Sequence, residues 1–158
     1  MKKNKGFSMV ELIIVIAIMA ILAGALAPAL IKYINKSRIS TDIQTAQTIA
    51  TAIQTALSNE NGYDDATNQA SPTDVSTIYN ASGDSFETAF TSAVGGSSSP
   101  TTKASKCVGS SPTSFTKGSF KYTLNKETST IVIYEPDGSH ILYPTASSCL
   151  SDETATCP

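Results

Sequence analysis

A run of twenty residues without a charge, residues 12–31, constrains this chain more than any other feature, and a glutamate stands directly before it. As a helix the run is roughly 30 Å long, enough to cross the hydrocarbon core of a bilayer. Glu11 then lies at the mouth of the apolar segment. A charge costs about 2.5–3.5 kcal/mol at the centre of a membrane helix and less near the interface. Glu11 therefore needs a partner, and the apolar run offers none.

The residues around this glutamate resemble the class III signal of type IV pilins and pseudopilins. A short basic leader ends at Gly6, Phe7 follows, and Glu11 is the fifth residue counted from that phenylalanine. The resemblance implies that a prepilin peptidase cuts after Gly6 and that Phe7 becomes N-methylated. It also implies a partner for Glu11, namely the amino-terminal charge of Phe7 in a neighbouring subunit of a helical filament.

Three other readings of the N-terminus compete with this one. A secretory signal peptide would use Ala25-Leu26-Ala27 as its cleavage box, but it would leave Pro28 first in the mature chain and give Glu11 no role. A single-pass anchor explains the length of the run but neither Gly6 nor Glu11. A lipoprotein fails, because no cysteine follows the apolar run closely.

Composition favours an exported, self-assembling protein over a cytosolic enzyme. The 158 residues leave roughly 100 for one small domain beyond the apolar run. The balance of 11 basic and 13 acidic side chains gives no electrostatic reason to expect nucleic acid as the main partner. Basic residues flank the run on both sides, so the positive-inside rule only slightly favours a cytoplasmic leader. Cysteines close together near the C-terminus suit an oxidising compartment, so we expect the globular part outside the cell membrane.

Beyond residue 31 the helical pattern becomes one-sided. Apolar residues recur in steps of three and four, and we expect them to pack against a sheet rather than to form a coiled-coil seam. The stripe comprises Ile39, Ile43, Ala46, Ala50, Ile53 and Leu57. A helix from about Ser8 to Asn59 would be about 75 Å long, so its apolar half must protrude from the domain into lipid or into other subunits.

Pro28 and Gly24 weaken one turn of this helix, since proline lacks an N–H and crowds the carbonyl four residues earlier. A packing kink is one outcome, because membrane helices tolerate both residues. The pilin resemblance suggests another, in which the segment from about Ala20 to Pro28 melts on assembly. Ala20 stands where many relatives have glycine, which bears on where such a segment would begin.

The remaining elements follow from turn and alternation signals. We expect the long helix to end at residues 59–62, with Gly62 as a left-handed cap, and a second helix to start at residues 71–74. A further helix begins near Asp84 or Ser85 and ends at Gly95-Gly96; its buried face is Phe86, Ala89, Phe90 and Ala93. Residues 95–114 are predicted to be a loop. Strands are expected at residues 120–124, 131–134 and 141–143, with a possible fourth near 115–116 and a hairpin turn at Pro136-Asp137-Gly138.

The three cysteines lie in the last third of the chain. In many pilins a C-terminal disulfide closes a surface loop, which here implies Cys149 with Cys157. Such a small loop loses roughly 2–3 kcal/mol of denatured-state entropy. Cys107 can instead pair with either of these, or remain a buried thiol.

The sequence offers little catalytic chemistry. His140 is the only histidine and is expected to be an ordinary strand residue, and no zinc spacing, phosphate loop or nucleophile elbow occurs, so we expect no enzyme, no metal site and no cofactor. The acidic pairs Asp64-Asp65 and Asp152-Glu153 suit solvated turns better than calcium. Nucleic acid stays an open partner, through a weak patch of Lys103, Lys106, Lys117, Lys121 and Lys126.

The sequence therefore predicts an α+β pilin fold with a long N-terminal helix packed on a small C-terminal antiparallel sheet. Its expected parts are a leader (1–6), a transmembrane and filament-core helix (7–31), an amphipathic half (32–60) and a globular part (61–158). The last comprises a connecting region (61–114), a sheet (115–144) and a tail (145–158).

The predicted function is that of a type IV pilus subunit, held in the cytoplasmic membrane and then assembled into an extracellular filament for adhesion, twitching motility or DNA uptake. Expected partners are other copies of the chain, membrane lipid, the prepilin peptidase, an assembly ATPase, a platform protein and minor pilins. A pseudopilin of a type II secretion or competence system is one alternative. A membrane-anchored or secreted binding domain is another.

Overall fold

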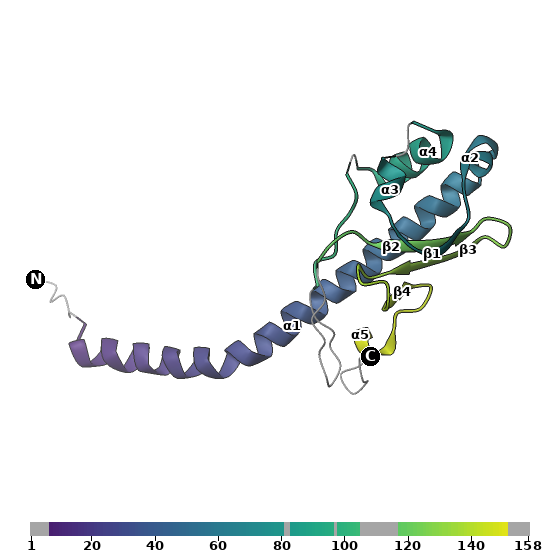
Figure 1. The fold of residues 1–158 in the computed structure, drawn as a ribbon. Coiled ribbons are helices and arrows are strands. Elements are labelled where there is room, and N and C mark those ends of the chain that lie inside the picture. The colour runs from purple at the N-terminus through teal and green to yellow at the C-terminus, as the bar shows by residue number, and fades with distance from the viewer. Residues whose placement is uncertain (1–6, 81–82, 97, 105–116, 152–158) are drawn as a thin grey trace, which may run out of the picture. The chain divides into compact units, whose positions relative to one another are not determined.

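The computed structural model describes residues 7–80, 83–96, 98–104 and 117–151. The chain divides into two compact units, residues 1–34 and 35–158. The second unit, called the head below, contains the sheet and the hydrophobic core (Figure 1).

The helix α1 (Met9–Leu57) is the longest element, and Pro28 lies inside it without ending it. Residues 9–34 are all exposed within the chain. In the head the same helix turns one face inward, and its buried residues are Ile39, Asp42, Ala46, Ile49, Ala50, Ala52, Ile53 and Ala56. The predicted stripe is confirmed at Ile39, Ala46, Ala50 and Ile53, while Ile43 and Leu57 are partly buried against the same core.

Four antiparallel strands form one sheet in the order β1 (Gln69–Asp74), β2 (Lys121–Asn125), β3 (Thr130–Tyr134) and β4 (Ile141–Tyr143). In the β2–β3 pair Tyr122 lies opposite Ile133, and Leu124 lies opposite Ile131. All four side chains are buried, as strand alternation requires when one face meets the core. The three predicted C-terminal strands are confirmed. The expected fourth strand near 115–116 lies outside the described residues, and β1 joins the sheet beside β2.

The core of the head lies between α1, this sheet and α4 (Ser85–Val94). The predicted start and end of α4 are confirmed: Asp84 accepts the Glu87 N–H at 2.6 Å, and Gly95 closes the helix at φ 76°. Phe86 and Phe90 are buried as expected, but Ala93 is exposed. Val94 packs against the core in its place.

The prediction that Gly62 caps the long helix in a left-handed conformation is wrong. After α1 the chain turns at once into α2 (Glu60–Asp65), whose cap is Asn59 and which contains Gly62. Here glycine is needed for space, because a Cβ at this position would lie 2.4 Å from the carbonyl oxygen of Ala56. Polar residues before a glycine suggested a helix end, whereas the close packing of α2 on the end of α1 is a tertiary feature.

The predicted helix start at residues 71–74 is also wrong. These residues belong to β1, an edge strand whose pairing with β2 is irregular between Gln69 and Thr73. Pro72 is tolerated there because an edge strand leaves some N–H positions without a strand partner. A short helix, α3 (Ser76–Tyr79), follows only after the strand. A last short helix, α5 (Ser148–Ser151), follows β4.

The fold is therefore α+β, with a long N-terminal helix and a four-stranded antiparallel sheet towards the C-terminal end of the chain. The predicted turn between β3 and β4 is confirmed: the Gly138 N–H donates to the Glu135 carbonyl at 2.9 Å, and Gly138 has φ 77°.

Candidate functional site

The start of α1 is closed by a hydrogen-bonded pair, Ser8 and Glu11. The Ser8 backbone N–H donates to Glu11 Oε2 at 2.9 Å, and the Val10 N–H donates to Ser8 Oγ at 3.4 Å. The Leu12 N–H closes the first helical turn on the Ser8 carbonyl at 3.2 Å. Serine before the helix and glutamate three residues on form one bond of a capping box, from the Ser8 N–H to Glu11, while the Ser8 hydroxyl accepts the Val10 N–H.

Glu11 thus has a partner within its own chain. The apolar run offers no partner, but Ser8 before the helix does, and serine followed by glutamate at this spacing is a recognised helix-start signal. A carboxylate in the first turn also opposes the positive end of the helix dipole. The arrangement places the Glu11 carboxylate on the backbone N–H of Ser8, the residue next to Phe7, whose side chain is 87% exposed.

The helix behind this charge presents apolar side chains on all sides. Within the chain none of its most apolar 18-residue window is buried, and the helix is long and apolar enough to cross a membrane. The exposed side chains include Met9, Leu12, Ile16, Met19, Ile21, Leu26 and Ile31. A helix that is apolar all round is stable only when lipid or other protein covers it.

Residues 1–27 match the family model described as the prokaryotic N-terminal methylation motif. The chain carries the class III signal peptide of type IV pilins and pseudopilins. No curated protein and no solved structure gives a significant match. The matched segment covers the leader and the first part of α1, and the head lies outside it.

Other site residues predicted from the sequence are only partly described. Gly24 and Pro28 both lie within α1, and nothing lies within 4 Å of where a Cβ on Gly24 would be. Cys149 is buried in α5. Gly6, Cys107 and Cys157 lie outside the described residues, so cleavage and the cysteine pairing stay predictions.

His140 is 4% exposed, and its Nδ1 lies 2.8 Å from Asp137 Oδ2. The Ser139 backbone N–H and hydroxyl donate to the same carboxylate, at 3.0 and 2.8 Å. Burial alone would raise the pKa of Asp137, but these hydrogen bonds and the charge of His140 together lower it below its usual value. The cluster lies in the turn between β3 and β4, so His140 directly precedes the strand in which it was expected.

Two buried carboxyl groups in the head were missed by the sequence argument. Asp42 is 1% exposed on the inward face of α1 and accepts the Lys103 N–H at 2.8 and 3.0 Å and the Ala104 N–H at 2.8 Å. Glu135 is 0% exposed just after β3. Both could have been found from spacing: Asp42 is three residues from Ile39 on the helical stripe, and Glu135 continues the inward phase of Ile131 and Ile133.

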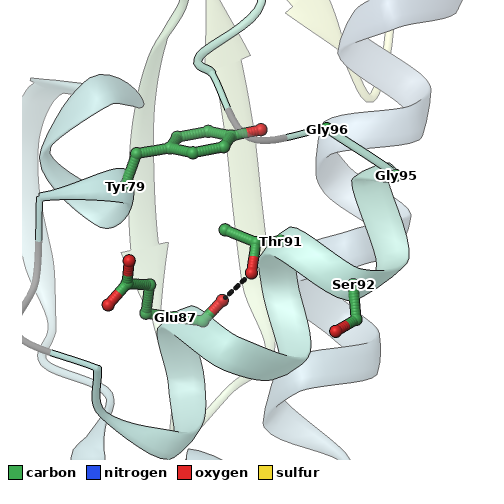
Figure 2. Close-up of a pocket in the computed structure, with 6 residues that line it drawn as sticks. All are labelled: Tyr79, Glu87, Thr91, Ser92, Gly95 and Gly96. Atoms are coloured by element: carbon green, nitrogen blue, oxygen red, sulfur yellow. Dashed lines mark hydrogen bonds between the residues drawn. The ribbon is translucent and has the colours of Figure 1, made fainter.

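A shallow polar depression between α3 and α4 is the site drawn in Figure 2. It is lined by Tyr79, Glu87, Thr91, Ser92, Gly95 and Gly96. Tyr79 reaches across it, with its ring edge-on to Phe90 at 5.5 Å and its pKa raised by burial. Its buried hydroxyl has no hydrogen-bond partner in the described part of the chain. Among the described residues no group of three or more His, Cys, Asp or Glu is placed to hold a metal ion.

Proposed function

We propose that this chain is the structural subunit of a type IV pilus, which polymerises through α1 into an extracellular filament. The observation that carries the proposal is the methylation motif over residues 1–27 together with an apolar helix that the described part of the chain leaves uncovered. Before assembly, lipid would cover that helix, with the head outside the cytoplasmic membrane. After assembly, other copies would cover it, because the same apolar surface suits both surroundings.

Cleavage after Gly6 would make Phe7 the first residue and give it a free amino group that can take part in assembly. The new amino group of Phe7 would lie next to Ser8, whose N–H is bonded to Glu11. We propose that Glu11 accepts this local N–H in the precursor and exchanges it for the charged Phe7 amine of a neighbouring subunit. An ion pair in a water-excluded surrounding is sensitive to geometry, so this exchange would fix the axial register of the filament.

Three further roles belong to the same proposal. Gly24 and Pro28 would allow part of α1 to melt as the helix moves from lipid to filament. Cys149 and Cys157 would close the C-terminal tail, with Cys107 as the alternative partner. A prepilin peptidase, an assembly ATPase, a platform protein and minor pilins would act on or beside the chain.

The test is the intact mass and N-terminal sequence of protein sheared from the surface of cells that make it. Long extracellular filaments whose chain begins at Phe7 with one added methyl group support the proposal. A processed, methylated chain that stays in short envelope-bound assemblies points to a pseudopilin. A chain that begins at Met1 or Pro28 contradicts processing at Gly6 and favours an anchored or secreted binding domain.

Two variants separate processing from assembly. Glu11→Gln keeps the shape of the side chain but removes its charge, so we expect a cleaved, methylated chain that forms few filaments. Glu127→Gln removes an exposed glutamate of the head and serves as the control, with wild-type filament yield. Normal filaments from Glu11→Gln would contradict the role given to the charge.

A further inference from the structure

Glu135 is a carboxyl group buried in the head, and the described part of the chain offers its side-chain oxygens no hydrogen-bond partner. It is 0% exposed, and both side-chain oxygens are buried without a hydrogen-bond partner among the described residues. Its backbone is fixed, because its N–H donates to the His140 carbonyl and its own carbonyl accepts the Gly138 N–H, each at 2.9 Å. The turn therefore holds the side chain in the core, where a charge without donors is strongly disfavoured.

Asp42 provides the contrast. Its carboxylate accepts three short contacts from two backbone N–H groups, those of Lys103 and Ala104, which belong to a strap made of residues 101–104. The strap is also held by the Thr102 N–H, which donates to the Gly118 carbonyl at 3.0 Å. Of these two buried carboxyl groups, Asp42 has donors that stabilise a negative charge, whereas Glu135 has none within residues 7–80, 83–96, 98–104 and 117–151.

Several charged groups of the head act on Glu135 and Asp42. Asp42 on α1 and Asp137 in the β3–β4 turn both act on Glu135, and both are acidic. Lys103 and Lys117 act favourably on Asp42, and His140 is paired with Asp137. Burial, followed by these two acidic neighbours, raises the pKa of Glu135 to about 8. Burial also raises the pKa of Asp42, against the lowering effect of its backbone donors.

We propose that Glu135 and Asp42 form a proton-dependent clasp in the head. With a proton on Glu135, Asp42 alone carries charge and holds the strap 101–104 against α1. Loss of that proton gives Glu135 a buried charge that has no donor among the described residues and that repels the Asp42 carboxylate, and the strap is released. This device is independent of the proposed pilus function, because it depends only on groups within the head.

The sign of the effect follows from linkage. A carboxyl group whose pKa is higher in the folded chain keeps its proton longer there than in the unfolded chain, so the folded state loses stability as pH rises. For Glu135 the loss begins near the ordinary value of 4.5 and is complete a little above about 8. Across that window its contribution to the folding equilibrium constant falls by up to tenfold per pH unit.

Hydrogen exchange of the strap amides in the full chain, held in detergent micelles, tests the clasp. After correction for the intrinsic pH dependence of exchange, we expect the protection of the Lys103 and Ala104 amides to fall at least tenfold between pH 6 and pH 9. The strands β2 and β3 in the same sample report the stability of the sheet. In Glu135→Gln, which cannot lose a proton, the strap protection should stay constant over this range. Glu127→Gln, with its exposed side chain, should behave like the wild type.

A direct titration keeps the test decisive if Glu135→Gln folds poorly. The carboxyl carbon of Glu135, observed by NMR in isotope-labelled wild-type chain, should titrate near pH 8 rather than near 4.5. Glu135→Met, which buries no polar atom, is the second variant and should also abolish the pH dependence at the strap. An ordinary titration midpoint, or a strap protection that falls equally in the wild type and in either variant, overturns the proposal.

Discussion

Replacing Gly62 by alanine should destabilise the head, even though alanine is the better helix former. Gly62 lies inside α2 with an ordinary helical backbone, where alanine would normally add about 1 kcal/mol. A Cβ there would lie 2.4 Å from the Ala56 carbonyl oxygen, a backbone atom at the end of α1 that cannot turn aside. Overpacking of this kind costs about 1–3 kcal/mol. We take a cost in the upper part of that range and subtract the gain of about 1 kcal/mol from the better helix former. The expected net loss in the stability of the head is about 1–2 kcal/mol.

The assay is urea unfolding of the full chain in detergent, followed by the near-ultraviolet circular dichroism of the tyrosines. The chain has six tyrosines and no tryptophan, and the buried Tyr122 reports on the core of the head. The midpoint should fall at unchanged slope, with a Tm lower by several degrees. Gly96→Ala is the control, because its Cβ would meet only the Ser98 carbonyl oxygen, at 3.8 Å. A Gly62→Ala head as stable as the wild type would show that α2 is not packed as closely as described.

Three further outcomes are expected. Asp84→Ala should lower the stability of the head by about 1 kcal/mol in the same urea assay, whereas Asp84→Ser should not, because the cap bond to the Glu87 N–H is restored. Gly24→Ala should strengthen α1 by about 1 kcal/mol and slow hydrogen exchange around that turn, since open space surrounds the new methyl group; unchanged exchange would contradict the weak-turn argument. Asp137 has a lowered pKa in the fold, so its stabilisation is present above its ordinary value and is lost as pH falls through the folded value. In Asp137→Asn this part of the acid unfolding profile should be absent, and an unaltered profile would show that the Asp137 carboxylate, with its bonds from Ser139 and its contact with His140, is not the source.

Much of the fold could be predicted because its signals are local. The ends of α4 follow from Asp84 and Gly95, whose side-chain acceptor and left-handed backbone act within one turn. The strands follow from alternation, which brings Tyr122 and Ile133 to one face regardless of what covers that face. The inward stripe of α1 is likewise a matter of helical spacing.

The errors arose where the packing or pairing of one element with another overrode a local signal. Residues 71–74 contain good helix-start residues, yet pairing with β2 made them an edge strand. Gly62 looked like a cap, yet its role is to let α2 approach α1. In the candidate site, Ser8 and Glu11 could have been identified as a capping box from spacing alone, whereas the backbone donors of Asp42 lie about sixty residues away along the chain.

The sequence by itself determined the character of the N-terminal half, because a charge-free run with a glutamate before it carries its chemistry in consecutive residues. The order of these residues gives the methylation motif and the apolar helix. It also gives the helix an exposed apolar surface that lipid or other protein must cover. Only the tertiary structure decided the head's internal electrostatics. Which of two buried carboxyl groups finds donors depends on where residues 103 and 104 cross α1, and desolvation is a property of the packed core rather than of any segment.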